Sequence, residues 1–369
     1  MASSSKQPSI AANTSVLTPA MTLEGHKPYM LTLSEGDRQE FKYIPYISYF
    51  PDGKQMISGS YDKTIRRWDL REGKEIKEAR EVYKDRVHGV RVSRDGRWVV
   101  TVVDEVLKVC EVETGIMRTF HDDLMTLKCI EISADSTLLA GESYDGIQIW
   151  SLDTGKLVAG PFRSTGVVVD ALGLSQDSRK LAVTSCNFDQ WESKFKQYLE
   201  VWDVQSQKLV VTREGSNTRG WINLPVFWTT KGKSITAVFA SESDDIDTIH
   251  EFDASTLKTV GDSFQGHTDH IWSLALSFDC LLLASASSDT IKLWSFESRQ
   301  LLASFNVQAL HSLILSPDSH QLAYTTLNEA RIYVCDIPAN ILASIGLAKE
   351  TSAHLAKLLD VCGPALLLI

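Results

Sequence analysis

The stretch FPDGKQMISGSYDKTIRRWD, from Phe50 to Asp69, contains the pattern that decides the fold. Pro51 fixes φ and Gly53 permits the positive φ that a tight hairpin needs, so the sequence predicts a turn here. An apolar strand follows, then a polar turn, then a third strand that ends at Trp68 before an acidic residue. Short strands joined by tight turns predict antiparallel β-structure.

The same pattern recurs along the chain. Aligning the sequence on the aromatic or apolar residue before each polar corner gives seven markers, which are Trp68, Cys110, Trp150, Trp202, Phe252, Trp294 and Cys335. Successive markers are 42, 40, 52, 50, 42 and 41 residues apart, so the fourth and fifth units carry insertions. A turn precedes each marker, at residues 51–53, 94–96, 134–136, 176–178, 231–233, 278–279 and 317–319. Seven turns and seven markers together predict a repeat array.

These units resemble the WD40 repeat over about residues 16–338. The matching dipeptides are Trp68-Asp69, Trp202-Asp203, Gly25-His26 and Gly266-His267. The resemblance implies an all-β fold, a seven-bladed WD40 β-propeller, in which radial repetition leaves only short protected sheet edges. The style of the repeats also resembles, more loosely, that of fungal WD40 proteins.

The resemblance also implies a buried, hydrogen-bonded tetrad of His, Ser or Thr, Asp and Trp in a complete repeat. The candidate members are His267, Ser285, Asp289 and Trp294 in the sixth unit, and His26, Ser58, Asp62 and Trp68 in the first. In the sixth unit the Asp-to-Trp spacing is one residue shorter than in the first. Extra sequence after His26 leaves the place of that histidine open. The other units lack at least one member, so we expect their stability to rest on packing.

The two ends differ in composition from the repeats. Residues 1–14 are rich in Ser, Ala and Asn and are predicted to be disordered. Residues 15–338 form the predicted propeller, and residues 15–23 are expected to close the ring as the outer strand of the last blade, beside residues 330–335. Residues 339–369 are predicted to form a tail, with helical spacing from Ala339 to Val361 and an apolar end.

Composition argues against several classes of function. The 369-residue chain has a formal net charge of −10 and a pI of about 5.4, so general nucleic-acid binding is not expected. It has no apolar stretch long enough to span a membrane and no apolar core of a secretory signal at its start. Six scattered cysteines without a CxxC pair predict reduced thiols in an intracellular protein, cytoplasmic or nuclear, and no zinc site.

Two fragments imitate catalytic motifs. Residues 232–234, Gly-Lys-Ser, resemble the end of a phosphate-binding loop, but the glycine required five residues earlier is Phe227. Residues 141–145 begin like a nucleophile elbow and lack its final glycine. Both coincide with repeat turns, so we expect no enzyme, no cofactor and no metal. A propeller hydrolase assembled from distant residues is the less favoured alternative.

The insertion in the fourth unit, at residues 187–198, is a candidate contact site. It places Trp191, Phe195 and Tyr198 among polar residues, a mixture typical of protein recognition. In the alternative interpretation, these aromatic side chains fold back over the neighbouring blade.

The fifth unit carries an acidic turn at residues 242–247. Its Asp244, Asp245 and Asp247 are candidates for binding a basic peptide, and the spacing does not match an EF-hand calcium loop. A solvated acidic loop without a ligand is the alternative.

A further set of candidates comes from aligning the innermost strand of each unit. The residue six positions before the turn is predicted to lie at the top mouth of the central channel. These residues are Pro45, His88, Lys128, Asp170, Leu224, Trp272 and His311. A mixed ring of aromatic, basic and acidic groups suits an entering peptide, and Trp272 is the strongest anchor candidate. An accessible rim with no binding role is the alternative.

The sequence therefore predicts a non-catalytic protein-interaction scaffold that binds partner proteins or peptides, including basic ones, on its top face. An adaptor, substrate receptor or sensor module of a ubiquitin ligase or of a chromatin-associated complex is the second interpretation.

Overall fold

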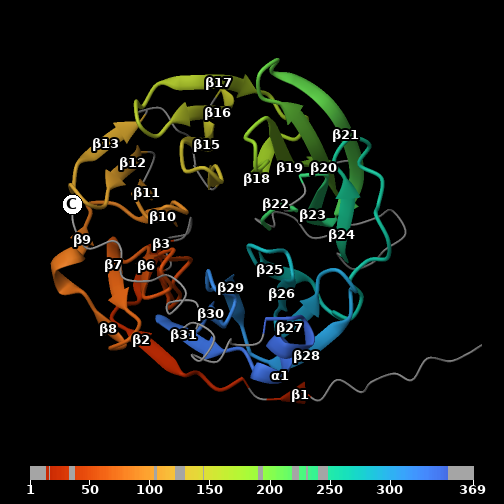
Figure 1. The fold of residues 1–369 in the computed structure, drawn as a ribbon. Helices are drawn as coiled ribbons and strands as arrows, with labels where there is room; N and C mark the ends of the chain where they lie inside the picture. Colours follow the sequence, from red (N-terminus) through yellow and green to blue (C-terminus); the bar gives the residue numbers. More distant parts are fainter. Residues whose placement is uncertain are drawn as a thin grey trace, which may run out of the picture.

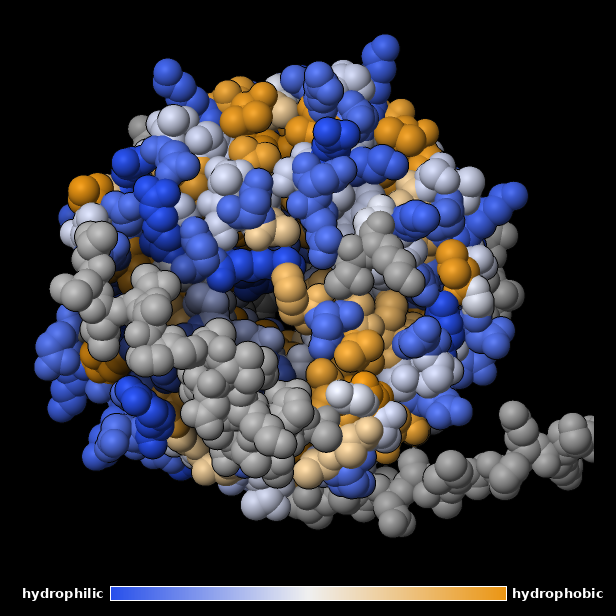
Figure 2. All heavy atoms as spheres, in the orientation of Figure 1, coloured by the Kyte–Doolittle hydropathy of each residue, from blue (hydrophilic) through white to orange (hydrophobic). Residues whose placement is uncertain are grey.

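The structure, a computed structural model, describes residues 14–15, 17–32, 38–103, 106–120, 129–143, 145–189, 194–217, 224–229, 232–239 and 248–347. Seven small antiparallel sheets are arranged as blades around a central channel (Figure 1). Figure 2 shows the central opening, with hydrophilic side chains along one part of its margin and hydrophobic ones along another. The predicted seven-bladed propeller is confirmed.

Each blade begins with its innermost strand and ends at the circumference. Blade 1 contains β5 (Tyr46–Tyr49), β6 (Gln55–Gly59), β7 (Thr64–Asp69), β8 (Lys74–Glu75) and β9 (Glu81–Val82). Blade 2 contains β10 (Val87–Val92), β11 (Trp98–Val103), β12 (Val106–Glu111) and β13 (Met117–Phe120). Blade 3 contains β14 (Ile130–Ile132), β15 (Leu138–Ser143), β16 (Gly146–Ser151) and β17 (Leu157–Phe162). Blade 4 contains β18 (Val168–Leu174), β19 (Lys180–Asp189), β20 (Lys194–Asp203) and β21 (Lys208–Asn217).

The remaining blades follow the same order. Blade 5 contains β22 (Phe227–Trp228), β23 (Ser234–Phe239) and β24 (Thr248–Asp253). Blade 6 contains β25 (Ile271–Leu276), β26 (Leu282–Ser287), β27 (Thr290–Ser295) and β28 (Leu301–Asn306). Blade 7 contains β29 (Leu310–Leu315), β30 (Gln321–Thr326), β31 (Arg331–Asp336) and β2 (Met21–Glu24).

The turn between the two innermost strands has one geometry in every blade. One residue per turn adopts a positive φ, between 56° and 73°, and these residues are Gly53, Gly96, Ser136, Ser178, Gly232, Cys280 and Ser319. In five of the blades a serine hydroxyl before this residue donates to the turn aspartate, as Ser277 Oγ does to Asp279 at 2.6 Å. The phosphate-loop look-alike at residues 232–234 falls on one of these turns, which accounts for its glycine.

The hydrophobic core lies between blades, because both faces of each sheet are covered by neighbours. Between blades 2 and 3, for example, Trp98 and Val109 pack with Leu139 and Trp150, and all four are at most 2% exposed. Apolar residues on both faces of short strands are therefore required at every unit, which explains the repeated sequence pattern.

The N-terminal segment closes the ring. Strand β2 pairs antiparallel with β31, with Met21 opposite Val334 and Leu23 opposite Ile332, as the sequence predicted. A second contact was not expected: β1 (Thr14–Ser15) adds in parallel to the outer edge of β28 in blade 6 (Figure 1).

A short helix, α1 (Ala339–Ser344), follows the last blade. Its buried side chains Ile341 and Leu342 join the core between blades 6 and 7, in the same cluster as Leu17. This helix ends well before Val361, because Gly346 adopts a φ of 80° that an α-helix does not accommodate. Residues 348–369, with the apolar end, lie outside the described residues.

Two insertions form regular structure instead of loops. The extra sequence after His26 forms a hairpin of β3 (Tyr29–Thr32) and β4 (Arg38–Phe41), with Tyr29 opposite Phe41. The predicted loop at residues 187–198 is largely a continuation of β19 and β20, which pair from Lys180–Asp203 to Asp189–Lys194. Cross-strand pairing along the insertion satisfies backbone groups that a long loop would leave to water.

Candidate binding surface at the channel mouth

The innermost strands of all blades start at the same face of the ring, which we call the top face. Four of the predicted mouth residues lie near these starts, and the list is His88, Asp170, Trp272 and His311. At each of them the pairing register shifts by one, so that each is the extra residue of a β-bulge. A bulge bends the strand and re-aims one side chain. The sequence alignment selected these positions as mouth residues, and the bulge at each of them is visible only in the structure.

The predicted mouth residues differ in how far their side chains are exposed, and only some of them lie at the surface. The Trp272 side chain is 52% exposed, which is high for the largest apolar residue, and His88 and His311 are half-buried. Asp170 is 5% exposed and accepts a hydrogen bond from Cys186 Sγ at 3.7 Å, so it offers no side chain at the surface. Pro45 and Leu224 are also buried, and Lys128 lies outside the described residues.

The two histidines are joined by a row of rings that crosses blade 1. We call this set the aromatic band; it comprises His311, Tyr43, Tyr29, Phe41, Tyr46, Tyr61 and His88. Ring centroids are 4.6 Å apart for His311 and Tyr43, 5.1 Å for Tyr29 and Tyr61, and 5.1 Å for Tyr61 and His88. The β3–β4 hairpin contributes Tyr29 and Phe41, whose rings stack at 5.4 Å. The extra sequence after His26 therefore contributes rings to the aromatic band.

The tetrad of blade 1 is assembled, with His26 in place. Trp68 Nε1 donates to Ser58 Oγ at 2.8 Å, Ser58 Oγ bonds with His26 Nε2 at 2.7 Å, and His26 Nδ1 bonds with Asp62 Oδ2 at 3.0 Å. Burial lowers the pKa of His26, so the neutral ring donates from Nδ1. Burial by itself would raise the pKa of Asp62, but hydrogen bonds from His26, Thr64 and the Lys27 backbone lower it to about 2.

The tetrad of blade 6 is only partly assembled. Trp294 Nε1 donates to Ser285 Oγ at 2.8 Å, and Ser285 Oγ bonds with His267 Nε2 at 2.7 Å. Asp289 does not reach His267; it accepts a hydrogen bond from Ser287 Oγ at 2.9 Å, and the group near His267 Nδ1 is Thr290 Oγ1 at 3.5 Å. The shorter Asp-to-Trp spacing of this unit accounts for the displaced carboxylate.

Blade 4 contains a polar network that sequence reasoning missed. The carboxylate of Glu200, 0% exposed, accepts from Ser164 Oγ at 2.8 Å, from the Thr165 backbone N–H at 3.0 Å and from the Thr165 hydroxyl. Trp202 Nε1 also points to it, at 3.4 Å, and Ser164 Oγ lies 2.6 Å from Ser185 Oγ. The expectation that units without a full tetrad rest on packing did not include this network of blade 4. A glutamate between Leu199 and Val201 in an apolar strand was the available signal.

The other predicted contact residues are only partly described. Tyr198 is half-buried in β20, opposite Glu214 of β21. Phe195 lies in β20 opposite Phe188, and Trp191 falls outside the described residues. The same holds for Asp244, Asp245 and Asp247. Within the described ranges, no three His, Cys, Asp or Glu side chains are grouped so that they could hold a metal ion.

One of the two histidines of the aromatic band, His311, is expected to make the stability of the protein depend on pH. Burial lowers the pKa of His311 to about 4, below the value near 6.5 of an unfolded chain. Between these two values only the unfolded state binds the proton, so stability is complete above pH 6.5 and is lost as the pH falls. We expect His311 to account for about 2 kcal/mol of lost unfolding free energy between pH 7 and pH 5. Urea denaturation of wild type and His311→Phe measures this share, and equal losses in both proteins would contradict the assignment.

Parts of the sequence are similar to a known family and to known proteins. The family WD domain, G-beta repeat, matches residues 17–69 and 258–295. Chicken p21-activated protein kinase-interacting protein 1-like is 23% identical over 169 residues, which is 45% of this chain and 42% of that protein. Rice small ribosomal subunit protein RACK1y is 26% identical over 123 residues, or 30% of this chain and 35% of that protein.

A third relative is much longer than the region it shares. Rat apoptotic protease-activating factor 1 is 31% identical over 114 residues, which is 30% of this chain and 9% of that protein. The matched stretches thus span less than half the length of each of these relatives. No helix among the described residues has the length and apolar character needed to cross a membrane.

Proposed function

Because the chain is a WD40-repeat protein whose seven blades close into a β-propeller, we propose that it acts by binding other proteins at its top face, without catalysis. The observation that carries the proposal is Trp272, which is half-exposed and re-aimed by a bulge at the start of an inner strand. Large aromatic side chains at concave sites often supply much of the energy of a protein interface.

The aromatic band supports the same location. Half-buried rings of Tyr43, Tyr61 and the two histidines offer apolar area at a low cost in side-chain entropy, because their conformations are already fixed by neighbours. Ring faces attract cations, and the net charge of the chain is −10, so a basic peptide segment is the favoured partner. We include the acidic turn at Asp244 and the aromatic insertion at Trp191 in this surface as part of the proposal.

The names of two relatives are consistent with a scaffold role. One is named as a protein that interacts with a kinase, and another as a protein of the small ribosomal subunit. We further propose an intracellular location: Cys110, Cys129, Cys186, Cys280 and Cys335 are all thiols, as expected in a reducing compartment.

The test is quantitative affinity capture with Trp272→Ala. Leu157→Ala is the matched control, since Leu157 is also 52% exposed but lies on β17 at the circumference of blade 3. A hot-spot residue costs 2 kcal/mol or more when truncated, so we expect Trp272→Ala to weaken the captured complex by roughly 30-fold and Leu157→Ala by less than about twofold. Recovery of the same partners at equal strength by Trp272→Ala and wild type would refute the proposed surface.

In the adaptor interpretation, the propeller presents substrates to a ubiquitin ligase or binds a chromatin component. This interpretation and the scaffold proposal predict different co-purifying proteins. The adaptor interpretation predicts that a ligase subunit or chromatin protein remains bound when Trp272 is replaced, because the effector then contacts a separate face.

A further inference from the structure

The outer edge of blade 1 is interrupted. Strand β8 pairs with the Trp68–Asp69 end of β7, and β9 pairs with its Thr64–Ile65 end. Between them the chain leaves the sheet as a short 3-10 helix, η1 (Lys77–Ala79). The Arg67 carbonyl still accepts a hydrogen bond from the Ile76 backbone N–H at 2.8 Å, but no described strand pairs with the outer side of β7 at Arg66. A pocket lies beside η1, between blades 1 and 2.

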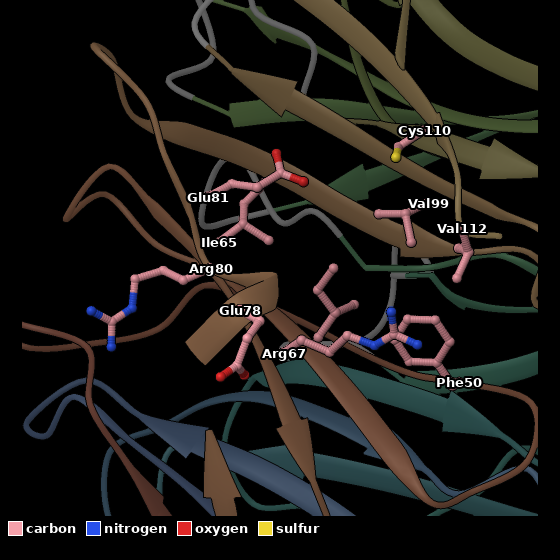
Figure 3. A pocket seen from close by; sticks show the side chains of 10 residues that line it. Phe50, Ile65, Arg67, Glu78, Arg80, Glu81, Val99, Cys110 and Val112 are labelled. Atoms are coloured by element: carbon pink, nitrogen blue, oxygen red, sulfur yellow. The ribbon is translucent and has the colours of Figure 1, made fainter. Parts of the chain in front are cut away.

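The floor of this pocket is apolar. Its lining includes Phe50, Ile57 and Ile65 from blade 1 and Val99 and Val112 from blade 2, with Cys110 beside them (Figure 3). The cavity volume is about 160 Å³. A cavity of about 150 Å³ lined by aliphatic and aromatic side chains binds benzene, so this one holds a single side chain of leucine or phenyl size. The rest of any ligand must lie outside the pocket.

The charged groups at the rim are not equivalent. Arg80 is engaged by Glu75, with Nε 2.6 Å from Oε1, and Glu81 accepts a hydrogen bond from the Tyr83 hydroxyl. Glu78 is exposed at the rim, where water screens its charge. Arg67 remains: it is half-buried and forms no close ion pair among the described residues, although the carboxylate of Asp52 acts on it from beyond ion-pair distance.

The position and partial burial of the Arg67 guanidinium favour the binding of an anion. It lies 4.2 Å from the centroid of the Phe50 ring, and its Nε donates to Gln55 Oε1 at 2.6 Å (Figure 3). Both of these contacting groups are neutral. Burial lowers the pKa of Arg67, which reflects partial removal of water from the cation, and the charge of Asp52 offsets only part of this effect. A planar, fixed guanidinium in this state favours a carboxylate, because the ion pair replaces the lost hydration.

We propose that this pocket binds an acidic peptide segment, in which one apolar side chain enters the cavity and a neighbouring aspartate or glutamate pairs with Arg67. The pocket lies at the circumference, away from the channel mouth, so the inference does not depend on the function proposed above. Its charge preference is also opposite, since the mouth favours a basic segment.

Two synthetic peptides test the proposal on the full chain. The first is acetylated and amidated Gly-Ser-Leu-Asp-Ser-Gly, and the second has asparagine in place of aspartate. By titration calorimetry we expect the aspartate peptide to bind at least about tenfold more tightly, since charge-assisted bonds to a guanidinium are about twice as strong as neutral ones. The aspartate peptide is also expected to slow alkylation of Cys110 by N-ethylmaleimide several-fold, while the half-buried Cys280 of blade 6 reacts at an unchanged rate.

Three variants locate the two halves of the site. Arg67→Gln is expected to make the two peptides bind equally, and Val112→Trp, which fills the cavity, to abolish binding of both. Arg71→Gln, which removes a positive charge of the same blade whose side chain is 73% exposed, is the control and should change neither. Absence of binding at millimolar peptide, or equal affinity of wild type for both peptides, overturns the proposal. The Arg67→Gln comparison decides the charge pairing even if Val112→Trp fails to fold.

Discussion

Replacing Glu200 by alanine is expected to lower the free energy of unfolding by about 3–5 kcal/mol, one of the two largest single effects in this protein. The carboxylate is 0% exposed and accepts hydrogen bonds from Ser164 and from two groups of Thr165. Its removal leaves these donors buried without an acceptor and opens a cavity beside Trp202. Urea or guanidinium denaturation at pH 7 measures the change.

Glu214→Ala provides the matched control, since Glu214 is a glutamate of the same blade whose side chain is 59% exposed. An exposed ion pair contributes little, so we expect a loss below about 1 kcal/mol. Glu200→Gln, which keeps the shape and one acceptor, should fall between the two. If Glu200→Ala and Glu214→Ala destabilise equally, the blade 4 network does not hold the blade together.

The second large effect concerns ring closure. Leu23→Ala is expected to cost about 2–5 kcal/mol, because Leu23 is 0% exposed and packs with Trp68 of blade 1 and Ile332 of blade 7. Deletion of residues 1–24 removes β1 and β2 and should cost more than Leu23→Ala. Thermal and chemical denaturation of the three proteins measure the order.

Thr22→Ala is the control for this prediction, since Thr22 is the exposed neighbour of Leu23 on the same strand. Its replacement should leave the unfolding midpoint nearly unchanged. A deletion protein that unfolds at the wild-type midpoint would mean that β2 does not contribute to the stability of the ring.

The repeat period predicted the blades and their turns because each blade meets the same physical demands. Every unit needs a left-handed residue in its inner turn and apolar residues on both strand faces, and both requirements are visible in residue type. Ser58, Asp62 and Trp68 of blade 1 could be proposed as tetrad members from residue type in the same way, whereas the extra sequence after His26 left the place of that histidine open. Closure by residues 15–23 followed from counting strands.

The features that could not be predicted from the sequence arise from local backbone irregularities and from contacts between distant segments. The β-bulges that re-aim Trp272 and His311 are one-residue register shifts with no residue-type signature. The β3–β4 hairpin brings Tyr29 next to Tyr61 from 32 positions away, and neither sequence neighbourhood indicates the other. The role of Glu200 was hidden because a charged residue in a strand ordinarily faces water, whereas both faces of a propeller blade are covered.

The pairing of β2 with β31 has a consequence for how the molecule is made. A ribosome delivers β2 some 300 residues before its partner strand, so the strand that completes blade 7 stays unpaired while blades 1 to 6 are made. The hydrogen bond from Thr325 Oγ1 to the Ile44 carbonyl, 281 residues apart in sequence, belongs to the same seam. Such long-range contacts slow folding, and blades 1 to 6 can form as translation proceeds while the seam cannot. During synthesis the edges of blades 1 and 7 that meet at this seam are therefore the last to be covered.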